Sequence, residues 1–495
     1  MTPQDETTIP VDIPTDSVKT SSKTVEVIDT GIVSQRELSK ELGFKEALSI
    51  GLGGTIGGGV FSVLGIAVGF AGPAAILSFA FGGVLGLLIG YSYVKLSLKY
   101  QSAGGSYTFA REAFGQYFGG AFGWLLWTGY LASCALYAYT FGAFFAHMIL
   151  EGASPLVIRL VSGAFATILI ALSTTINLVG VKETGKSQNI IVLIKVIILV
   201  AFVAITIPAA IKNAGTNLTP FFADAERNPL DVWTGLAMAV VGTSILFVAF
   251  EGMELIPNAA EEIQNPEKNI PRSIYGTVII ATVIYLLVAF TALGGTDYTI
   301  FAGDSEKAEY ALAIAAQPVL GRAGFIIITL GALFSTASAF NASLYGSSRM
   351  TYVMARDGIF PKFFKKVSKK SRVPFISIIT ISGITLIFTL ALDLTQIANL
   401  ASSIFLLLFA IVSLSGFILR KKIKANFIIP LVGFILATGL FGIFTWNLIR
   451  NVISEVGAGI YNQSFITIIL LPLLIIVMSI GSVITIKAQL KKVEN

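Results

Sequence analysis

The sequence of 495 residues contains one cysteine, Cys134, and one histidine, His147. A lone cysteine excludes an intramolecular disulfide, and a lone histidine without a carboxylate cluster indicates no metal site. We interpret both as helix-packing residues. The sequence also lacks a nucleophile elbow, a phosphate-binding loop and an interpretable pair of catalytic carboxylates. These absences predict that the protein is not an enzyme and holds no cofactor or metal.

Charge is scarce as well. Only 13% of the residues are charged, whereas 55% are hydrophobic and the mean hydropathy is +0.81. A chain this apolar is not a soluble globular domain, so we predict an all-α integral membrane protein embedded in the lipid bilayer. Apolar runs of roughly 20 residues, the length of a membrane-spanning helix, predict twelve spans, at residues 46–70, 73–98, 118–149, 155–179, 188–211, 231–256, 272–294, 323–354, 374–392, 395–419, 426–449 and 464–486.

The chain begins with a polar segment. Its first thirty residues are rich in Thr, Ser, Asp and Pro, without apolar periodicity. Such a composition is typical of disorder, and the segment lacks the basic start and short apolar core of a secretory signal. We therefore predict a disordered cytoplasmic tail at residues 1–35.

The basic residues predict how the spans are oriented. When alternate loops are assigned to opposite faces, most of the 34 lysines and arginines fall on one face, which the positive-inside rule makes cytoplasmic. An even number of spans places both termini on that side, so we predict a multi-pass protein of the cell membrane. The basic clusters lie at helix ends, which argues against a nucleic-acid partner. The sequence indicates no oligomeric state.

Two of the predicted spans contain residues that a plain spanning helix avoids. The first contains GLGGTIGGGVF at residues 51–61, and the sixth contains FVAFEGMELIPNAAEE at residues 247–262. Each interior glycine costs a helix roughly 1 kcal/mol relative to alanine, and charged groups at bilayer depth are costly too. Interrupted spans at matching positions of two halves indicate a transporter built from inverted repeats. A ten-helix 5+5 core would then occupy residues 36–420, and two additional helices with a short cytoplasmic tail would occupy residues 421–495.

A broken helix offers backbone groups to a ligand. Unpaired N–H groups at the start of one half-helix favour an anion, and free carbonyls at the end of the other favour a cation. Together they fit the carboxylate and ammonium of an amino acid, and glycines at residues 57 to 59 would let the ligand approach the main chain. The alternative interpretation is close helix packing, which spacings such as that of Gly53 and Gly57 also serve in membranes.

Four segments resemble the amino acid, polyamine and organocation (APC) transporters in their order and separation. GTIGGGVF (54–61) is similar to the first-helix signature, and SAGGSYTFAREAFG (102–115) to the loop and short helix after span two. FVAFEGMELIPNAAEEIQNPEKNIPRSI (247–274) resembles the sixth-helix motif, and SSRMTYVMARDGIFPKFF (347–364) the end of span eight. The resemblance covers most of the chain. It implies the leucine-transporter-like fold, with discontinuous helices 1 and 6, and alternating-access transport of a small amino acid or amine.

The resemblance also implies a substrate site at the two breaks. Backbone of residues 56–59 would hold the substrate carboxylate, and carbonyls of both breaks would accept from its ammonium. Phe247 or Phe250 would supply an aromatic lid, the alternative for each being lipid or helix packing. The implied site comprises Thr55, Ile56, Gly57, Gly58, Gly59, Phe247, Phe250, Glu251 and Gly252.

Glu251 departs from the pattern that it otherwise resembles. The family usually has a neutral residue before the glycine of this break, whereas an acid at the position of Glu254 is common. A carboxylate that faces the pocket would favour cationic substrates or take part in proton handling. One that faces a water-filled vestibule would do neither.

Lys195 stands alone among branched aliphatic residues in NIIVLIKVIILVAF, residues 189–202. It lies too far from a helix end to reach water readily. Desolvation disfavours the charged form of a buried amine, so we expect Lys195 to exchange a proton near physiological pH. The alternative is a structural lysine that pairs with a carbonyl and never titrates.

The resemblance gives Lys195 a role in proton coupling. Several sodium-independent members have a lysine in span five, whose ammonium occupies the space of a sodium ion in sodium-coupled relatives. Here it would contact the carbonyl of Gly53 and hydroxyls of span eight such as Ser335 or Ser338. Protonated Lys195 would favour the outward-open or occluded form, and loss of the proton toward the inside would release those contacts.

The sequence thus predicts proton-coupled amino acid symport without a sodium gradient. An exchanger of amino acids or amines is the first alternative, with Lys195 as a fixed structural cation. A nutrient sensor with a transporter fold is a second, which is disfavoured because no soluble output domain follows residue 487. A membrane-embedded enzyme would need a reactive constellation, and the sequence contains none.

Overall fold

The computed structural model describes residues 42–150, 152–302 and 305–457. Over this part of the chain the secondary structure is helical, with two isolated β-bridges, Leu42 to Ile263 and Ala223 to Pro229. The predicted disordered tail and the twelfth predicted span lie outside the described residues.

The first five predicted spans correspond to helices of the described chain. Long helices suit these apolar runs because each helix pairs its own backbone groups, which lipid cannot do. The elements are α1 (Phe44–Thr55), α2 (Gly58–Ser62), α3 (Leu64–Ala71), η1 (Gly72–Ala74), α4 (Ala75–Lys99), α5 (Gly105–Phe114), α6 (Gln116–Ile149), α7 (Pro155–Val179) and α8 (Val181–Asn217).

The next six predicted spans are helical as well. Asp231 begins the first of these helices by accepting from the backbone N–H groups of Trp233 and Thr234, a typical N-cap. The elements are α9 (Val232–Leu246), η2 (Phe247–Phe250), α10 (Gly252–Asn258), η3 (Ala260–Glu262), α11 (Pro266–Gly295), α12 (Thr299–Ala302), α13 (Ser305–Ala308), α14 (Ala311–Arg356), η4 (Lys362–Lys365), α15 (Phe375–Ala391), α16 (Leu394–Ile418), α17 (Arg420–Ile423) and α18 (Ile428–Gly457).

Nine helical segments of the described chain are long and apolar enough to cross a membrane. The predicted span at residues 46–70 is broken near its middle, and α15, at the predicted span 374–392, is an apolar helix of 17 residues. The chain is therefore a multi-pass membrane protein. The count of twelve spans and the 5+5 repeat stay predictions.

α14 begins before the predicted span at residues 323–354. The helix is kinked at Gly321, whose φ of 60° and ψ of −151° are not helical. Glycine adopts a positive φ without strain, whereas a residue with a Cβ atom is strained there. The helical turns before the kink include Pro318, and the predicted span is the straight part that follows.

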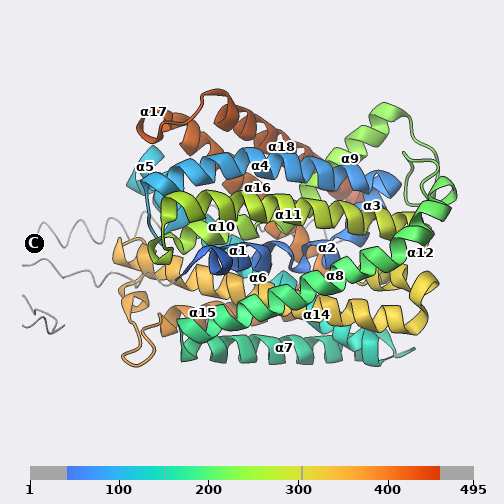
Figure 1. Ribbon diagram of the computed structural model, residues 1–495, viewed down its shortest axis with the longest axis horizontal. Coiled ribbons are helices and arrows are strands. Elements are labelled where there is room, and N and C mark those ends of the chain that lie inside the picture. The colour runs from blue at the N-terminus through green and yellow to red at the C-terminus, as the bar shows by residue number, and fades with distance from the viewer. Residues whose placement is uncertain (1–41, 151, 303–304, 458–495) are drawn as a thin grey trace, which may run out of the picture. The chain divides into compact units, whose positions relative to one another are not determined.

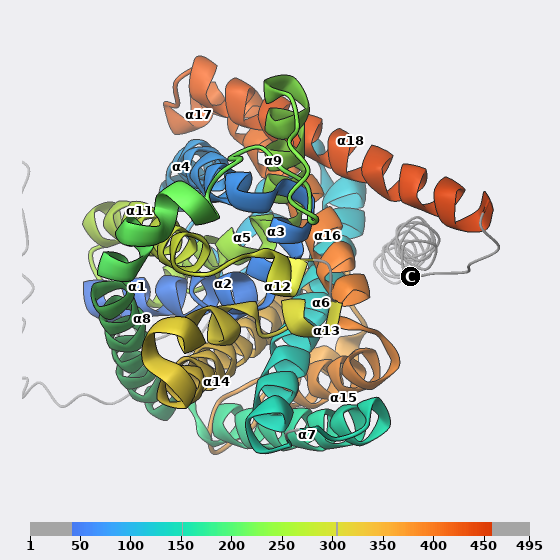
Figure 2. The same ribbon diagram turned by 90° about the vertical axis from the view of Figure 1, so that its right-hand side faces the viewer.

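The broken first span lies in the interior of the helix bundle. α1 packs against α8, α10, α11 and α14, and Figures 1 and 2 show α1 and α2 between α11 on one side and α8 with α14 on the other. The helices α7, α8 and α18 have exposed apolar side chains such as Leu160, Ile197 and Trp446. These apolar side chains can face lipid, whereas residues 50–55 of α1 are all buried inside the protein.

Candidate functional site

The first span breaks at Ile56 and Gly57. α1 ends at Thr55, Ile56 has φ −79° and ψ 58°, and Gly57 has φ −104° and ψ −126° before α2 begins at Gly58. An α-helix leaves its last four carbonyls without partners in the same helix. The amide of Ile56 donates to the carbonyl of Leu52, so the carbonyls from Gly53 to Ile56 need donors from elsewhere.

Lys195 supplies two of these donors. Its Nζ lies 2.9 Å from the carbonyl oxygen of Gly53 and 2.6 Å from that of Ile56. It also lies 3.3 Å from Ser338 Oγ on α14, and Lys195 is completely buried. Lys195 on α8 therefore connects the break in span one with α14.

The two serines predicted near Lys195 take different positions. Ser338 contacts the amine and is also 2.9 Å from Gln188 Nε2 on α8. Ser335 donates instead to the carbonyl of Ile56, at 2.7 Å. Both hydroxyls belong to the polar cluster at the end of α1, but only Ser338 is a direct neighbour of the ammonium.

Two tyrosine hydroxyls lie near the carbonyls of Gly54 and Thr55. Tyr137 Oη on α6 lies 3.4 Å from the carbonyl oxygen of Gly54. Tyr285 on α11 donates to the carbonyl of Thr55, and its hydroxyl also lies 3.1 Å from the carbonyl oxygen of Ala249. Nothing in the sequence singles out either residue among the 15 tyrosines of the chain, because the helix-end carbonyls that they reach belong to other spans.

The sixth span breaks beside the first. α9 ends at Leu246, the 3-10 turn η2 follows, and α10 begins at Gly252. A Cβ placed on Gly252 would lie 2.1 Å from the backbone nitrogen of Thr55, so the main chains of the two breaks touch there. Glycine is required at this approach because any side chain would collide with backbone.

The glycines of the first break also pack against neighbouring helices. A Cβ on Gly57 would lie 2.3 Å from the Cβ of Ala339, and one on Gly59 would lie 2.2 Å from the Cβ of Ala249. Close helix packing, the alternative interpretation of the glycine cluster, therefore applies at these positions. α2 has no side-chain cap at its N-terminus, and ligand binding by the backbone of these glycines stays a prediction.

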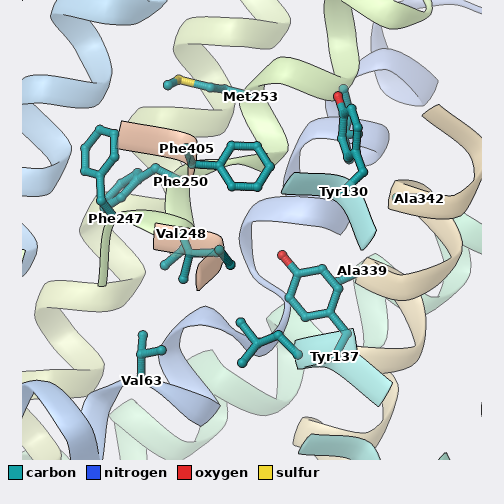
Figure 3. Packing of buried hydrophobic residues seen from close by; sticks show 14 of the residues in the cluster. Val63, Tyr130, Tyr137, Phe247, Val248, Phe250, Met253, Ala339, Ala342 and Phe405 are labelled. Carbon is teal, nitrogen blue, oxygen red and sulfur yellow. The ribbon is translucent and has the colours of Figure 1, made fainter. Parts of the chain in front are cut away.

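Phe247 and Phe250 are both buried in aromatic surroundings. The ring centroid of Phe250 lies 5.6 Å from that of Tyr285, and the centroid of Phe247 lies 5.4 Å from that of Phe409. Figure 3 shows Phe247 beside Phe250, with Tyr137 near Ala339. In this conformation both phenylalanines have packing contacts, and the lid role stays a prediction for either.

The side chain of Glu251 contacts residues of α6 and α14. It is 1% exposed, accepts a hydrogen bond from Ser133, and lies 2.7 Å from Tyr137 Oη and 3.4 Å from Ser343 Oγ. All three partners are hydroxyls. The carboxylate therefore lies in the protein interior in this conformation, and Tyr137 connects it with the end of α1.

A second polar cluster lies where η3 meets α14, at the end of the bundle that carries α5 and η4. Glu262 Oε1 lies 2.9 Å from Arg349 Nε, and Glu262 Oε2 lies 2.9 Å from Tyr345 Oη. The guanidinium of Arg349 also lies 3.4 Å from the centre of the Tyr345 ring. The backbone of Leu42 pairs with Glu262 and Gln264 beside this cluster, so the chain before α1, the end of span six and α14 are held together.

This ion pair gives a testable prediction about stability. Removing one partner of a buried pair leaves an uncompensated charge, which typically costs about 3–5 kcal/mol. We expect Arg349→Met to lower the free energy of unfolding in mixed micelles by that amount. The double variant with Glu262→Met should regain much of the loss.

Arg356→Ala on the same helix is the matched control, because its side chain is 38% exposed and its ion pair with Asp357 is long, at 3.8 Å. It should change the free energy of unfolding by at most about 0.5 kcal/mol. Equal effects of the two arginine variants would show that the buried pair does not hold the helices together.

A sequence profile of the amino acid permease family, described as "Amino acid permease", matches residues 46–495. The chain belongs to this family. It is therefore a transporter and not an enzyme, as the sequence predicted.

Individual relatives align with about four fifths of the chain. Protein MJ0609 of Methanocaldococcus jannaschii, itself uncharacterized, is 33% identical over 81% of this chain and 88% of its own. The methylthioribose transporter of Bacillus subtilis is 28% identical over 80% of this chain and 85% of its own. The branched-chain amino acid permease BcaP of Bacillus subtilis is 26% identical over 81% of this chain and 85% of its own.

Proposed function

We propose that the protein is a secondary active transporter that carries an amino acid across the cell membrane in symport with protons, by alternating access. Membership of the amino acid permease family supports amino acid transport. The proposal places the substrate carboxylate on the N–H groups at Gly57 to Gly59 and the substrate ammonium on carbonyls of the two breaks. The basic face and both termini are cytoplasmic in this proposal.

The contacts of Lys195 carry the proton-coupling part of the proposal. The ammonium holds the carbonyls of Gly53 and Ile56 and reaches Ser338 on α14. An amine without its extra proton has two donors instead of three and no charge, so it holds these three acceptors less strongly. Deprotonation would therefore weaken the connection between α8 and the broken helix, and the connection would re-form when the proton returns.

The cluster of Glu262, Tyr345 and Arg349 supports a closed cytoplasmic side in this conformation. The residues at the two breaks are buried as well, among them Thr55, Phe247 and Glu251. We therefore assign the conformation to an occluded state. In the proposed cycle, loss of the proton from Lys195 precedes separation of the Glu262 and Arg349 side chains.

Uptake into proteoliposomes tests the proposed function. Vesicles with an imposed inward proton gradient and no sodium should accumulate a labelled amino acid from a mixture of the twenty. Dissipating the gradient with an ionophore should remove the accumulation. Uptake that requires preloading with amino acid and ignores pH would mean an exchanger, with Lys195 as a fixed structural cation.

The relatives do not decide the cargo. One relative is named for methylthioribose and another for branched-chain amino acids, so membership of the family does not determine the substrate. The substrate class has to come from the residues of this chain.

A further inference from the structure

We propose that the loop between α14 and α15, residues 357–374, is a binding surface for anionic lipid headgroups of the surrounding membrane. The loop contains no residue of the two breaks, so lipid binding there does not depend on the proposed transport function. Three features of the described residues support the surface: its charge, its folded conformation with exposed apolar side chains, and its position at the end of the bundle.

Positive charge is concentrated in this loop and is not neutralised there. Its only carboxylate, Asp357, pairs with Arg111 on α5, and residues 358–392 contain no aspartate or glutamate. The basic residues of the loop are all exposed, and none forms a salt bridge with a residue that the structure describes. Each such residue strengthens binding to an anionic membrane surface by about fivefold. The six are Lys362, Lys365, Lys366, Lys369, Lys370 and Arg372.

The loop is folded, which holds part of this charge in place. The amide of Ser368 donates to the carbonyl of Val373 at 2.9 Å, and the amide of Arg372 donates to the carbonyl of Ser368 at 3.0 Å. These two hydrogen bonds close a turn that contains Lys369 and Lys370. A preorganised surface loses less conformational entropy on binding than an unfolded basic segment does.

The loop also exposes apolar side chains between its lysines. Phe363 is 48% exposed and Val367 is 39% exposed, whereas Phe364 of η4 is buried. At a membrane surface such side chains enter the boundary between headgroups and acyl chains, next to basic residues that contact the headgroups. The positive-inside rule requires only charge in a short loop, so it does not account for the exposed phenylalanine.

The position of the loop matches the level of the membrane surface. The ring centroid of Phe360, close to the end of α14, lies 4.0 Å from that of Trp124 on α6. The first turn of α6 contains Tyr117 and Phe118, both exposed, and exposed aromatic residues at helix ends are typical of the interface between lipid and water. Figure 1 shows the loop at the same end of the bundle as α5 and the basic helix α17.

Native mass spectrometry of the purified full chain tests the proposal. The protein in a neutral detergent is titrated with phosphatidylglycerol or with phosphatidylcholine of the same acyl chains, and the dissociation constant of the first bound lipid is measured. We expect wild type to bind phosphatidylglycerol at least about tenfold more tightly, because one headgroup contacts two or more of the basic residues. The preference should decrease at high ionic strength, since salt screens exposed charges.

Two double variants locate the site. Lys369→Gln with Lys370→Gln removes two exposed charges from the closed turn and should reduce the preference to below about threefold. The matched control is Lys212→Gln with Arg450→Gln, which removes two exposed basic residues near the ends of α8 and α18. It should keep the wild-type preference.

Equal affinities of wild type for the two lipids would overturn the proposal without recourse to any variant, and would leave an acidic soluble protein as the partner of the loop. Retention of the preference in the Lys369 and Lys370 double variant would overturn it as well, because the lipid would then bind elsewhere. Glycerol 1-phosphate has the charged phosphate without acyl chains and should not displace the lipid. Displacement at a similar affinity would mean a site for free phosphate and not for lipid.

Discussion

Proton-driven uptake by Lys195→Ala should fall to the level of vesicles without protein. The substitution removes the amine that donates to the carbonyls of Gly53 and Ile56, and alanine offers no substitute. The carbonyl of Ile56 keeps Ser335 as a donor, but that of Gly53 loses its donor, which costs about 1–3 kcal/mol, so we also expect a lower melting temperature. Initial uptake rates under a proton gradient and thermal melting of the purified protein measure the two effects.

A substrate-binding assay distinguishes a coupling defect from misfolding in Lys195→Ala. Lys195→Ala should still bind the amino acid that wild type binds, because the amine approaches the break from α8 and Ser335 remains on the carbonyl of Ile56. Lys212→Ala is the matched control, because Lys212 is an exposed lysine near the end of the same helix. Gradient-driven uptake above half of the wild-type rate in Lys195→Ala would reject the proposed coupling role.

Gly252→Ala should destabilise the protein and abolish transport. The added Cβ would lie 2.1 Å from the backbone nitrogen of Thr55 and 2.5 Å from the carbonyl oxygen of Gly51. Neither is the end of a flexible side chain, so α1 and α10 would have to separate. Overpacking of a core typically costs about 1–3 kcal/mol, and a clash between two main chains places this variant at or above that range. Thermal melting and uptake measure the outcome.

Gly383→Ala is the control for the glycine substitution. Gly383 lies inside α15 and a Cβ placed there meets no atom within 4 Å. Alanine favours a helix over glycine by about 1 kcal/mol, so this variant should melt at the wild-type temperature or slightly above it. Wild-type melting and uptake in Gly252→Ala would show that the two breaks do not touch in the working protein.

Much of the fold is predictable because the determining signals are local. Apolar runs place eleven of the predicted spans on helices of the described chain, and glycines and charges within two of them place the breaks. The prediction is less accurate at α14, where helical residues begin at Ala311, before the predicted span, and a kink at Gly321 separates the two parts. Hydropathy measures where a segment is apolar and not where a helix bends.

The candidate site is predictable only for residues that look unusual in their own span. Lys195 is such a residue, a single cation among aliphatic side chains, and Glu251 is another. Tyr137 and Tyr285 do not differ from other membrane tyrosines in sequence, although they reach the carbonyls of Gly54 and Thr55. Their importance comes from partners 83 and 230 residues away along the chain.

The sequence by itself determined that this chain crosses the membrane many times, that two spans are interrupted and that one lysine is buried among them. Composition and short-range pattern are sufficient for these conclusions because a segment in lipid needs apolar side chains and a helix that pairs its own backbone groups. Only the tertiary structure decided which donors satisfy the carbonyls of the broken helix, that Gly252 touches the main chain of Thr55, and that Glu251 faces hydroxyls of α6 and α14. Those relations depend on the packing and rotation of helices that are distant in sequence.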